Sequence, residues 1–89
     1  MGVVNYEVLL SELIKPLVSN PNEVAISIVE ESDKYIKLKV SVDPEDLGRI
    51  IGRKGRIANA IRTIAHAAAI RDNMRIDIDL ASEEVEEQN

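Results

Sequence analysis

Residues 50–57, IIGRKGRI, place two glycines three positions apart with two basic residues between them. A helix start signal precedes this stretch and a helical hydrophobic pattern follows it, so the glycines must end one helix and admit the start of another. With 89 residues and 45% hydrophobic composition, the chain can build one core of modest size. We therefore expect a single domain organised around a two-glycine junction between helices.

The first segment predicts an amphipathic helix over residues 6–17. Its apolar residues recur at three- and four-residue spacing, and Asn5 precedes them as an N-cap. They are Tyr6, Leu9, Leu10, Leu13, Ile14 and Leu17. Pro16 cannot donate a backbone hydrogen bond four residues back, so the helix should kink or end there, before a turn over residues 19–23.

Three further segments alternate apolar and polar residues, which is the period of a β-strand. They are residues 24–28, 35–42 and 74–80, and residues 30–34 should form the turn between the first two. Such regular alternation predicts a sheet that is covered on one face only.

Two helices are expected between the second and third strand patterns. Asp43 followed by Pro44 and two acids is a strong helix start, and this helix should run to about Ile51. The next helix should run from Arg56 to about Ile70. Its expected core stripe comprises Ile57, Ile61, Ile64, Ala65 and Ala68, and its solvent-facing side comprises Asn59, Arg62, Thr63 and His66.

The net charge of the chain is −5, but the charges are unevenly distributed. Residues 45–75 carry a net charge of +4, against −3 for residues 1–44 and −6 for residues 76–89. This pattern indicates one local anion site on an acidic protein rather than a surface coated for nonspecific nucleic-acid binding. The basic residues around the junction are Arg49, Arg53, Lys54, Arg56 and Arg62.

Nucleotide-binding loops do not fit the junction. A P-loop needs a preceding strand and the pattern G-x-x-x-x-G-K-[ST], whereas a helix precedes here and arginine follows the second glycine; G-x-G-x-x-G is also absent. Two alternatives remain. The junction is either an ordinary helix-to-helix turn with solvated cations, or a nucleic-acid clamp whose glycines let a phosphodiester backbone approach the helix that begins at Arg56.

In this helix-loop-helix setting, IIGRKGRI resembles the I-G-x-x-G-x-x-I signature of KH domains. The order helix, strand, strand, helix, helix, strand is similar to the bacterial (type II) KH arrangement, and the chain resembles the small single-KH proteins of the KhpA family. The resemblance implies an α+β fold in which three helices pack on one face of a three-stranded sheet. The KH domain would occupy residues 1–81, and residues 82–89 would form an acidic, disordered tail.

The resemblance further implies that residues 52–55 clamp the backbone of about four nucleotides of single-stranded RNA. The residues expected to bind RNA are Arg49, Ile50, Ile51, Gly52, Arg53, Lys54, Gly55, Arg56, Ile57, Ile61 and Arg62. The isoleucines would form an apolar floor for the bases, although helical spacing also assigns Ile57 and Ile61 to the core. Tyr6 and Tyr35 are the only aromatic residues, so a stacking platform is excluded and sequence preference should be weak.

Two classes of function stay open. The protein is either an RNA chaperone or post-transcriptional regulator, or an adaptor that docks a partner protein with incidental RNA contact. The alanine-rich helix over residues 56–70 is consistent with self-association. The resemblance implies the same, as a homodimer or as a heterodimer with a larger KH-containing protein of the KhpB kind.

No enzymatic activity is expected, because the sequence offers no catalytic constellation, no metal-ligand pattern and no cofactor motif. The chain also has no cysteine, no apolar run long enough to span a membrane and no N-terminal secretion signal. We therefore expect a cytoplasmic protein that makes no membrane contact.

Overall fold

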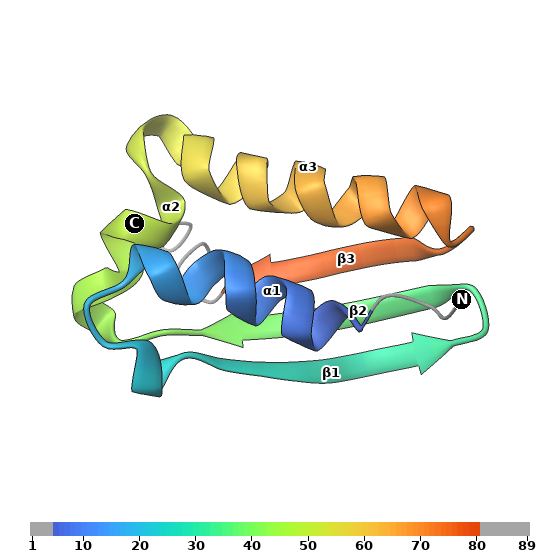
Figure 1. Cartoon of the computed structure of the whole chain (residues 1–89), viewed down its shortest axis with the longest axis horizontal. Coiled ribbons are helices and arrows are strands. Elements are labelled where there is room, and N and C mark those ends of the chain that lie inside the picture. Colours follow the sequence, from blue (N-terminus) through green and yellow to red (C-terminus); the bar gives the residue numbers. More distant parts are fainter. Residues whose placement is uncertain (1–4, 81–89) are drawn as a thin grey trace.

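A computed structural model of the chain describes residues 5–80 as three α-helices that cover one face of a three-stranded sheet (Figure 1). The elements in chain order are α1 (Tyr6–Ile14), β1 (Ala25–Ser32), β2 (Tyr35–Ser41), α2 (Leu47–Ile51), α3 (Arg56–Arg71) and β3 (Arg75–Leu80). The strands lie in the order β1-β2-β3, with β1 antiparallel and β3 parallel to β2. The α+β architecture and the element order predicted from the sequence are confirmed.

The core lies between the sheet and the helices. Along β2 and β3 every second residue is buried, and the residues between them are exposed or half-buried on the open face of the sheet. The helices contribute residues at three- and four-residue spacing. The main buried residues are Tyr6, Leu10 and Ile14 of α1, Ile36, Leu38 and Val40 of β2, Ala58, Ile61, Ala65 and Ala69 of α3, and Ile76, Ile78 and Leu80 of β3.

The parallel pairing of β2 with β3 determines where the two-glycine junction lies. Parallel neighbours cannot be joined by a tight hairpin, so the chain must cross back over the sheet before the second strand begins. Here α2, the junction and α3 make that crossover, and the junction lies at the end of the sheet where β2 and β3 end (Figure 1).

The turn expected over residues 30–34 is wrong in its extent. β1 continues to Ser32, and only Asp33 and Lys34 form the turn. A bulge between Ile28 and Glu30 shifts the register and brings Glu30 opposite Lys37. The extra residue in a bulge and the opposite charges of this cross-strand pair favour continued pairing where the sequence pattern ended.

Two apolar residues of the predicted helical stripes are exposed instead. Leu17 belongs to a short 3₁₀ turn, Lys15–Leu17, that follows α1, so it no longer continues the stripe of that helix. On α3, Ile64 is 46% exposed. The buried stripe of α3 is rotated toward Ala58 and Ala69, because alanine lets the helix axis approach the sheet closely.

A tyrosine links the beginning of α1 to the end of α3. The buried Tyr6 hydroxyl donates a hydrogen bond to Asp72 Oδ2 at 2.9 Å. Burial, followed by this hydrogen bond and the charge of Asp72, raises the pKa of Tyr6 to about 12. The two helices are thereby joined at the end of the molecule opposite the junction.

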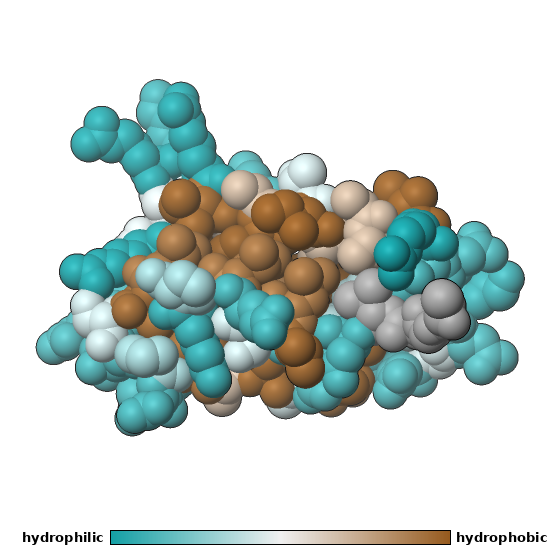
Figure 2. Space-filling model, viewed as in Figure 1, coloured by the Kyte–Doolittle hydropathy of each residue, from teal (hydrophilic) through white to brown (hydrophobic). Residues whose placement is uncertain are grey.

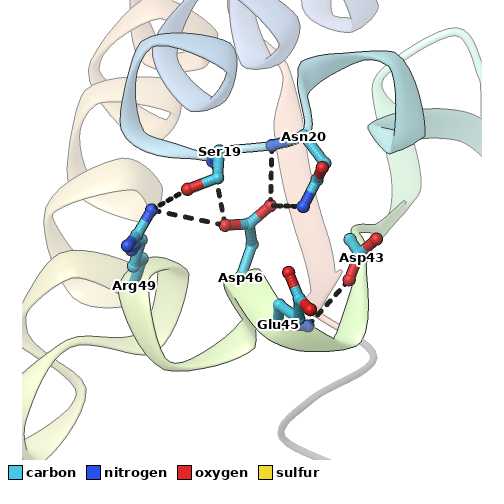
Figure 3. A network of polar contacts seen from close by, with 6 residues as sticks. All are labelled: Ser19, Asn20, Asp43, Glu45, Asp46 and Arg49. Atoms are coloured by element: carbon cyan, nitrogen blue, oxygen red, sulfur yellow. Dashed lines mark hydrogen bonds and ion pairs between the residues drawn. The ribbon is translucent and has the colours of Figure 1, made fainter.

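A buried carboxylate connects the α1–β1 linker to the segment that leads into α2 (Figure 3). Asp46 is 1% exposed; its Oδ1 accepts the Ser19 backbone N–H at 2.9 Å, and its Oδ2 accepts the Asn20 backbone N–H at 3.0 Å. Arg49 forms an ion pair with Asp46 at 3.6 Å and donates to Ser19 Oγ. The hydrogen bond from Ser19, those from Asn20 and the charge of Arg49 hold the pKa of Asp46 below its ordinary value, against the opposing effect of burial.

This carboxylate should make folding stability depend on acid pH. Because the pKa of Asp46 is lower in the folded than in the unfolded chain, the unfolded chain binds more protons as the pH falls. The stabilisation is therefore present at neutral pH and is lost as the pH falls from the ordinary carboxyl range through the folded pKa. Urea denaturation across this range should show that Asp46→Asn lowers the free energy of unfolding at neutral pH and flattens its loss in acid.

The exposed neighbour Glu45 provides the control, because its side chain makes none of these contacts. Glu45→Gln should leave both the stability at neutral pH and its acid dependence near those of the wild type. Parallel acid profiles for Asp46→Asn and the wild type would show that Asp46 is not the titrating group.

Candidate nucleic-acid interface

The junction between α2 and α3 reverses the chain within four residues. Three of the four have left-handed φ angles, namely Gly52 at 74°, Lys54 at 58° and Gly55 at 75°. The turn is closed by hydrogen bonds from the Gly55 N–H to the Gly52 carbonyl oxygen at 3.1 Å and from the Arg56 N–H to that of Arg53. The result is a compact loop that places α3 directly after α2.

The first glycine is required by packing inside the protein. Gly52 has φ 74° and ψ 172°, a region that only glycine occupies readily. A Cβ atom at this position would lie 2.4 Å from Ile57 Cγ1 and 2.9 Å from the Ile57 nitrogen. We expected both glycines to clear space for a ligand, but the missing side chain of Gly52 instead makes room for the first turn of α3.

The second glycine leaves space outside the protein. Gly55 adopts the left-handed conformation, and a Cβ atom built on it would meet no atom within 4 Å. No side chain caps the N-terminus of α3, which begins at this residue. A phosphate can therefore approach this end of α3 closely, where the partial positive charge of the helix lies.

Three cations surround this open backbone. Arg53, Lys54 and Arg56 are exposed, and none of them forms an ion pair or side-chain hydrogen bond with another residue of the range 5–80. Figure 2 shows hydrophilic side chains projecting from the region of the loop, at the upper left of the molecule. The loop thus offers unpaired positive charge beside accessible backbone.

The structure gives Arg49 a different setting from the other cations. It lies on α2 and is engaged by Asp46 and Ser19, as described above (Figure 3). Its guanidinium group therefore contributes to the attachment of the α1–β1 linker. Sequence reasoning missed Asp46, Ser19 and Asn20, because Asp46 was interpreted only as an acid in the first turn of a helix.

The sequence pattern predicts that both Arg62 and His66 face solvent; the structure bears this out for His66, which is exposed, but not for Arg62. Arg62 is half-buried and donates from Nε at 3.4 Å and Nη2 at 3.2 Å to the carbonyl oxygen of Ile78. His66 Nε2 lies 3.1 Å from the carbonyl oxygen of Ile76, which can accept a hydrogen bond from the Nε2–H tautomer. Both side chains line the space between α3 and the free edge of β3, and their i, i+4 spacing matches two successive edge carbonyls.

The isoleucines near the loop lie mainly in the core. Ile50, Ile51 and Ile61 are buried, and Ile57 is half-buried beneath the loop. Their side chains support α2 and α3 from inside. Direct contact between them and bases stays a prediction.

Within residues 5–80, no group of three or more His, Cys, Asp or Glu side chains is arranged to hold a metal ion. In the same range no helix has both the length and the apolar character needed to cross a membrane.

Comparison with known proteins identifies the family of the chain. A family model described as KhpA/KhpB, KH domain matches residues 7–80. The chain belongs to this family. The KhpA proteins of two bacteria, both named RNA-binding protein KhpA, are among its relatives.

The relative from Listeria monocytogenes is 42% identical over 74 residues, which cover 83% of this chain and 96% of that protein. The relative from Clostridium acetobutylicum is 44% identical over 72 residues, which cover 81% of this chain and 95% of that protein. No solved structure matches the chain significantly. This KH domain therefore spans nearly the full length of its KhpA relatives.

The two glycines of this KH domain should differ in their effect on stability. Gly52→Ala should cost about 3 kcal/mol or more, since backbone strain and overpacking against Ile57 add together. Gly55→Ala should cost only about 1 kcal/mol, the penalty for a left-handed alanine in open space. Chemical denaturation of the purified variants measures both.

Gly48→Ala is the matched control, because Gly48 lies in α2 with no atom near its absent Cβ and without a positive φ. It should stabilise the protein by roughly 0.5–1 kcal/mol. Equal losses in the free energy of unfolding for Gly52→Ala and Gly55→Ala would contradict the packing role of Gly52.

Proposed function

We propose that this protein binds single-stranded RNA by clamping its sugar-phosphate backbone against residues 52–55. The observation that carries this proposal is the open left-handed backbone at Gly55, beside the unpaired cations Arg53, Lys54 and Arg56. Backbone N–H groups and basic side chains hold phosphates without reading sequence. The family and the names of the KhpA relatives support the same ligand.

From the loop, the strand would follow the space between α3 and β3. Arg62 lines this route and adds a fourth cation, while Ile51 and Ile57 are the loop isoleucines that keep some accessible surface. Tyr6 is buried, so neither the loop nor this part of the groove offers an aromatic ring for stacking. Binding through phosphates and apolar contacts favours an RNA chaperone or post-transcriptional regulator with weak base preference. We place this activity in the cytoplasm.

Reversing the charge of the loop should remove RNA binding. The double variant Arg53→Asp with Lys54→Asp replaces two exposed cations and leaves the core untouched. We expect an affinity loss of at least tenfold for a single-stranded oligoribonucleotide, measured by fluorescence anisotropy. Log affinity should fall with log salt with a slope of about −2 for the wild type, and the double variant should reduce that slope by about 1.4, at about 0.7 per phosphate contact.

The matched control is Lys37→Asp with Lys39→Asp, which reverses two cations on the open face of the sheet. It should change affinity by no more than about twofold, provided that circular dichroism shows an intact fold. Wild-type affinity for the loop variant would reject RNA clamping and would favour an adaptor that docks a partner protein.

We further propose that the protein forms a homodimer through the outer surfaces of α1 and α3. Figure 2 shows hydrophobic residues gathered over these two helices. On α3, Ile64 is 46% exposed, and Ile57 and Ala68 lie on the same side at heptad-like spacing. On α1, Leu9 and Leu13 are only partly buried. The same apolar surface would suit a heterodimer with a larger KH-containing partner of the KhpB kind.

Placing a charge in this surface should separate the protomers. Ile64→Asp should convert the dimer to a monomer in analytical ultracentrifugation, because a carboxylate would be buried without a partner. Affinity for a short RNA that reaches only one loop should stay within about twofold, whereas affinity for a long RNA should fall because two linked sites are lost. Thr63→Asp, also exposed on α3, is the control. An unchanged mass for Ile64→Asp would contradict this interface.

A further inference from the structure

A hollow lies at the far end of α3, away from the loop. It has a volume of about 290 Å³ and is formed where the C-terminal part of α3 meets the beginning of β3. Its lining includes Tyr35, His66, Ile70, Met74, Arg75 and Asp77. The hollow is at the lower end of the size range of small-ligand pockets, which suits one ring system rather than a whole nucleotide.

The walls of this hollow are apolar and include a side chain with no role in the core. Ile70 is 76% exposed, the highest exposure among the exposed large hydrophobic residues of the range 5–80. Met74 faces it from the start of β3 and is half-buried. A large exposed apolar side chain at the mouth of a hollow provides a flat contact for a planar ring.

The rim of the hollow is polar and offers both donors and acceptors. The Tyr35 hydroxyl donates to Asp77 Oδ2 at 2.8 Å, which leaves the second carboxylate oxygen of Asp77 outside that bond. Arg75 contributes a guanidinium group. A nucleobase edge carries donors and acceptors together, so this combination fits its hydrogen-bonding pattern.

The hollow adjoins the route proposed for RNA at His66. His66 lines it and also contacts the edge of β3, one helical turn after Arg62. From Arg56 to Ile70 the helix rises about 21 Å, at 1.5 Å per residue. A stacked strand with a rise of 3.4 Å covers this distance in about six nucleotides, and a stretched strand needs fewer.

Neighbouring cations favour RNA over a protein segment as the occupant. An adjoining hollow of about 360 Å³ is lined by Lys34, Ile70, Asn73, Met74 and Arg75. Neither Lys34 nor Arg75 forms an ion pair with another residue of the range 5–80. Phosphates on either side of a seated base would therefore meet unpaired positive charge.

We propose that a nucleobase of the bound strand, beyond the nucleotides held by the loop, is seated in the hollow between Ile70, Met74 and the Arg75–Asp77 rim. This assignment rests on the proposed RNA-binding function and extends the footprint along the full length of α3. It makes Ile70 and Arg75 contacts for the distal end of the RNA segment.

The test compares a trinucleotide with an octanucleotide of uridine by NMR titration of the ¹⁵N-labelled protein. Both should shift the amide signals of residues 52–55, and only the octanucleotide should shift those of Ile70, Met74 and Arg75. Ile70→Ser should weaken octanucleotide binding by about tenfold, the effect of losing one base contact, and leave trinucleotide binding unchanged. Using the Ile64→Asp background excludes effects of dimerisation.

Val29→Ser is the matched control, since Val29 is 56% exposed on β1 and lies outside both hollows. It should not alter binding of either RNA. If the trinucleotide binds but the octanucleotide leaves residues 70–77 unshifted, the distal site is overturned and the loop site stands. If Ile70→Ser in the otherwise wild-type protein lowers the oligomer mass, and in the Ile64→Asp background leaves octanucleotide binding unchanged, the hollow is a protein contact and the proposal is also overturned. If neither RNA binds, the proposed function itself fails.

Discussion

Parallel pairing of β2 with β3 is the constraint on which the candidate site depends. It obliges the chain to cross the sheet between these strands, and the crossover consists of two helices joined within four residues. Such a short connection is possible only because Gly52 lets Ile57 pack against the backbone of the loop. The closeness of α2 and α3 then leaves the Gly55 backbone at the molecular surface, where the cations of the loop surround it.

The three sides of helix α3 make different contacts. One side, rich in alanine, lies against the sheet; a second carries Arg62 and His66 against the edge of β3; a third exposes Ile64. RNA contact and self-association would therefore use opposite sides of one helix. A dimer formed through Ile64 can leave the side of α3 beside β3 accessible, so that the two activities proposed for this domain do not compete.

The element order, the junction and the one-sided sheet could be predicted because they follow from local signals, namely residue periodicity, glycine and helix caps. The orientation of α3 about its own axis could not be predicted in this way. Six alanines and several isoleucines leave the helical pattern nearly symmetric, and contact with the sheet determines that Ala58 is buried while Ile64 is exposed. The hydrogen bonds of Asp46 could not be predicted either, since its partners Ser19 and Asn20 are far away in the sequence.

The charges of the described residues explain how an acidic protein can attract RNA at one place. On the open face of the sheet, Lys37 lies opposite both Glu30 and Asp77, and Lys39 lies opposite Asp79. These cations are compensated by neighbouring strands. The loop has no acidic residue between Gly52 and Arg56, so its positive charge is not cancelled locally. An approaching polyanion therefore meets repulsion or neutrality over the sheet and attraction at the helix junction, which directs it to the loop over residues 52–55.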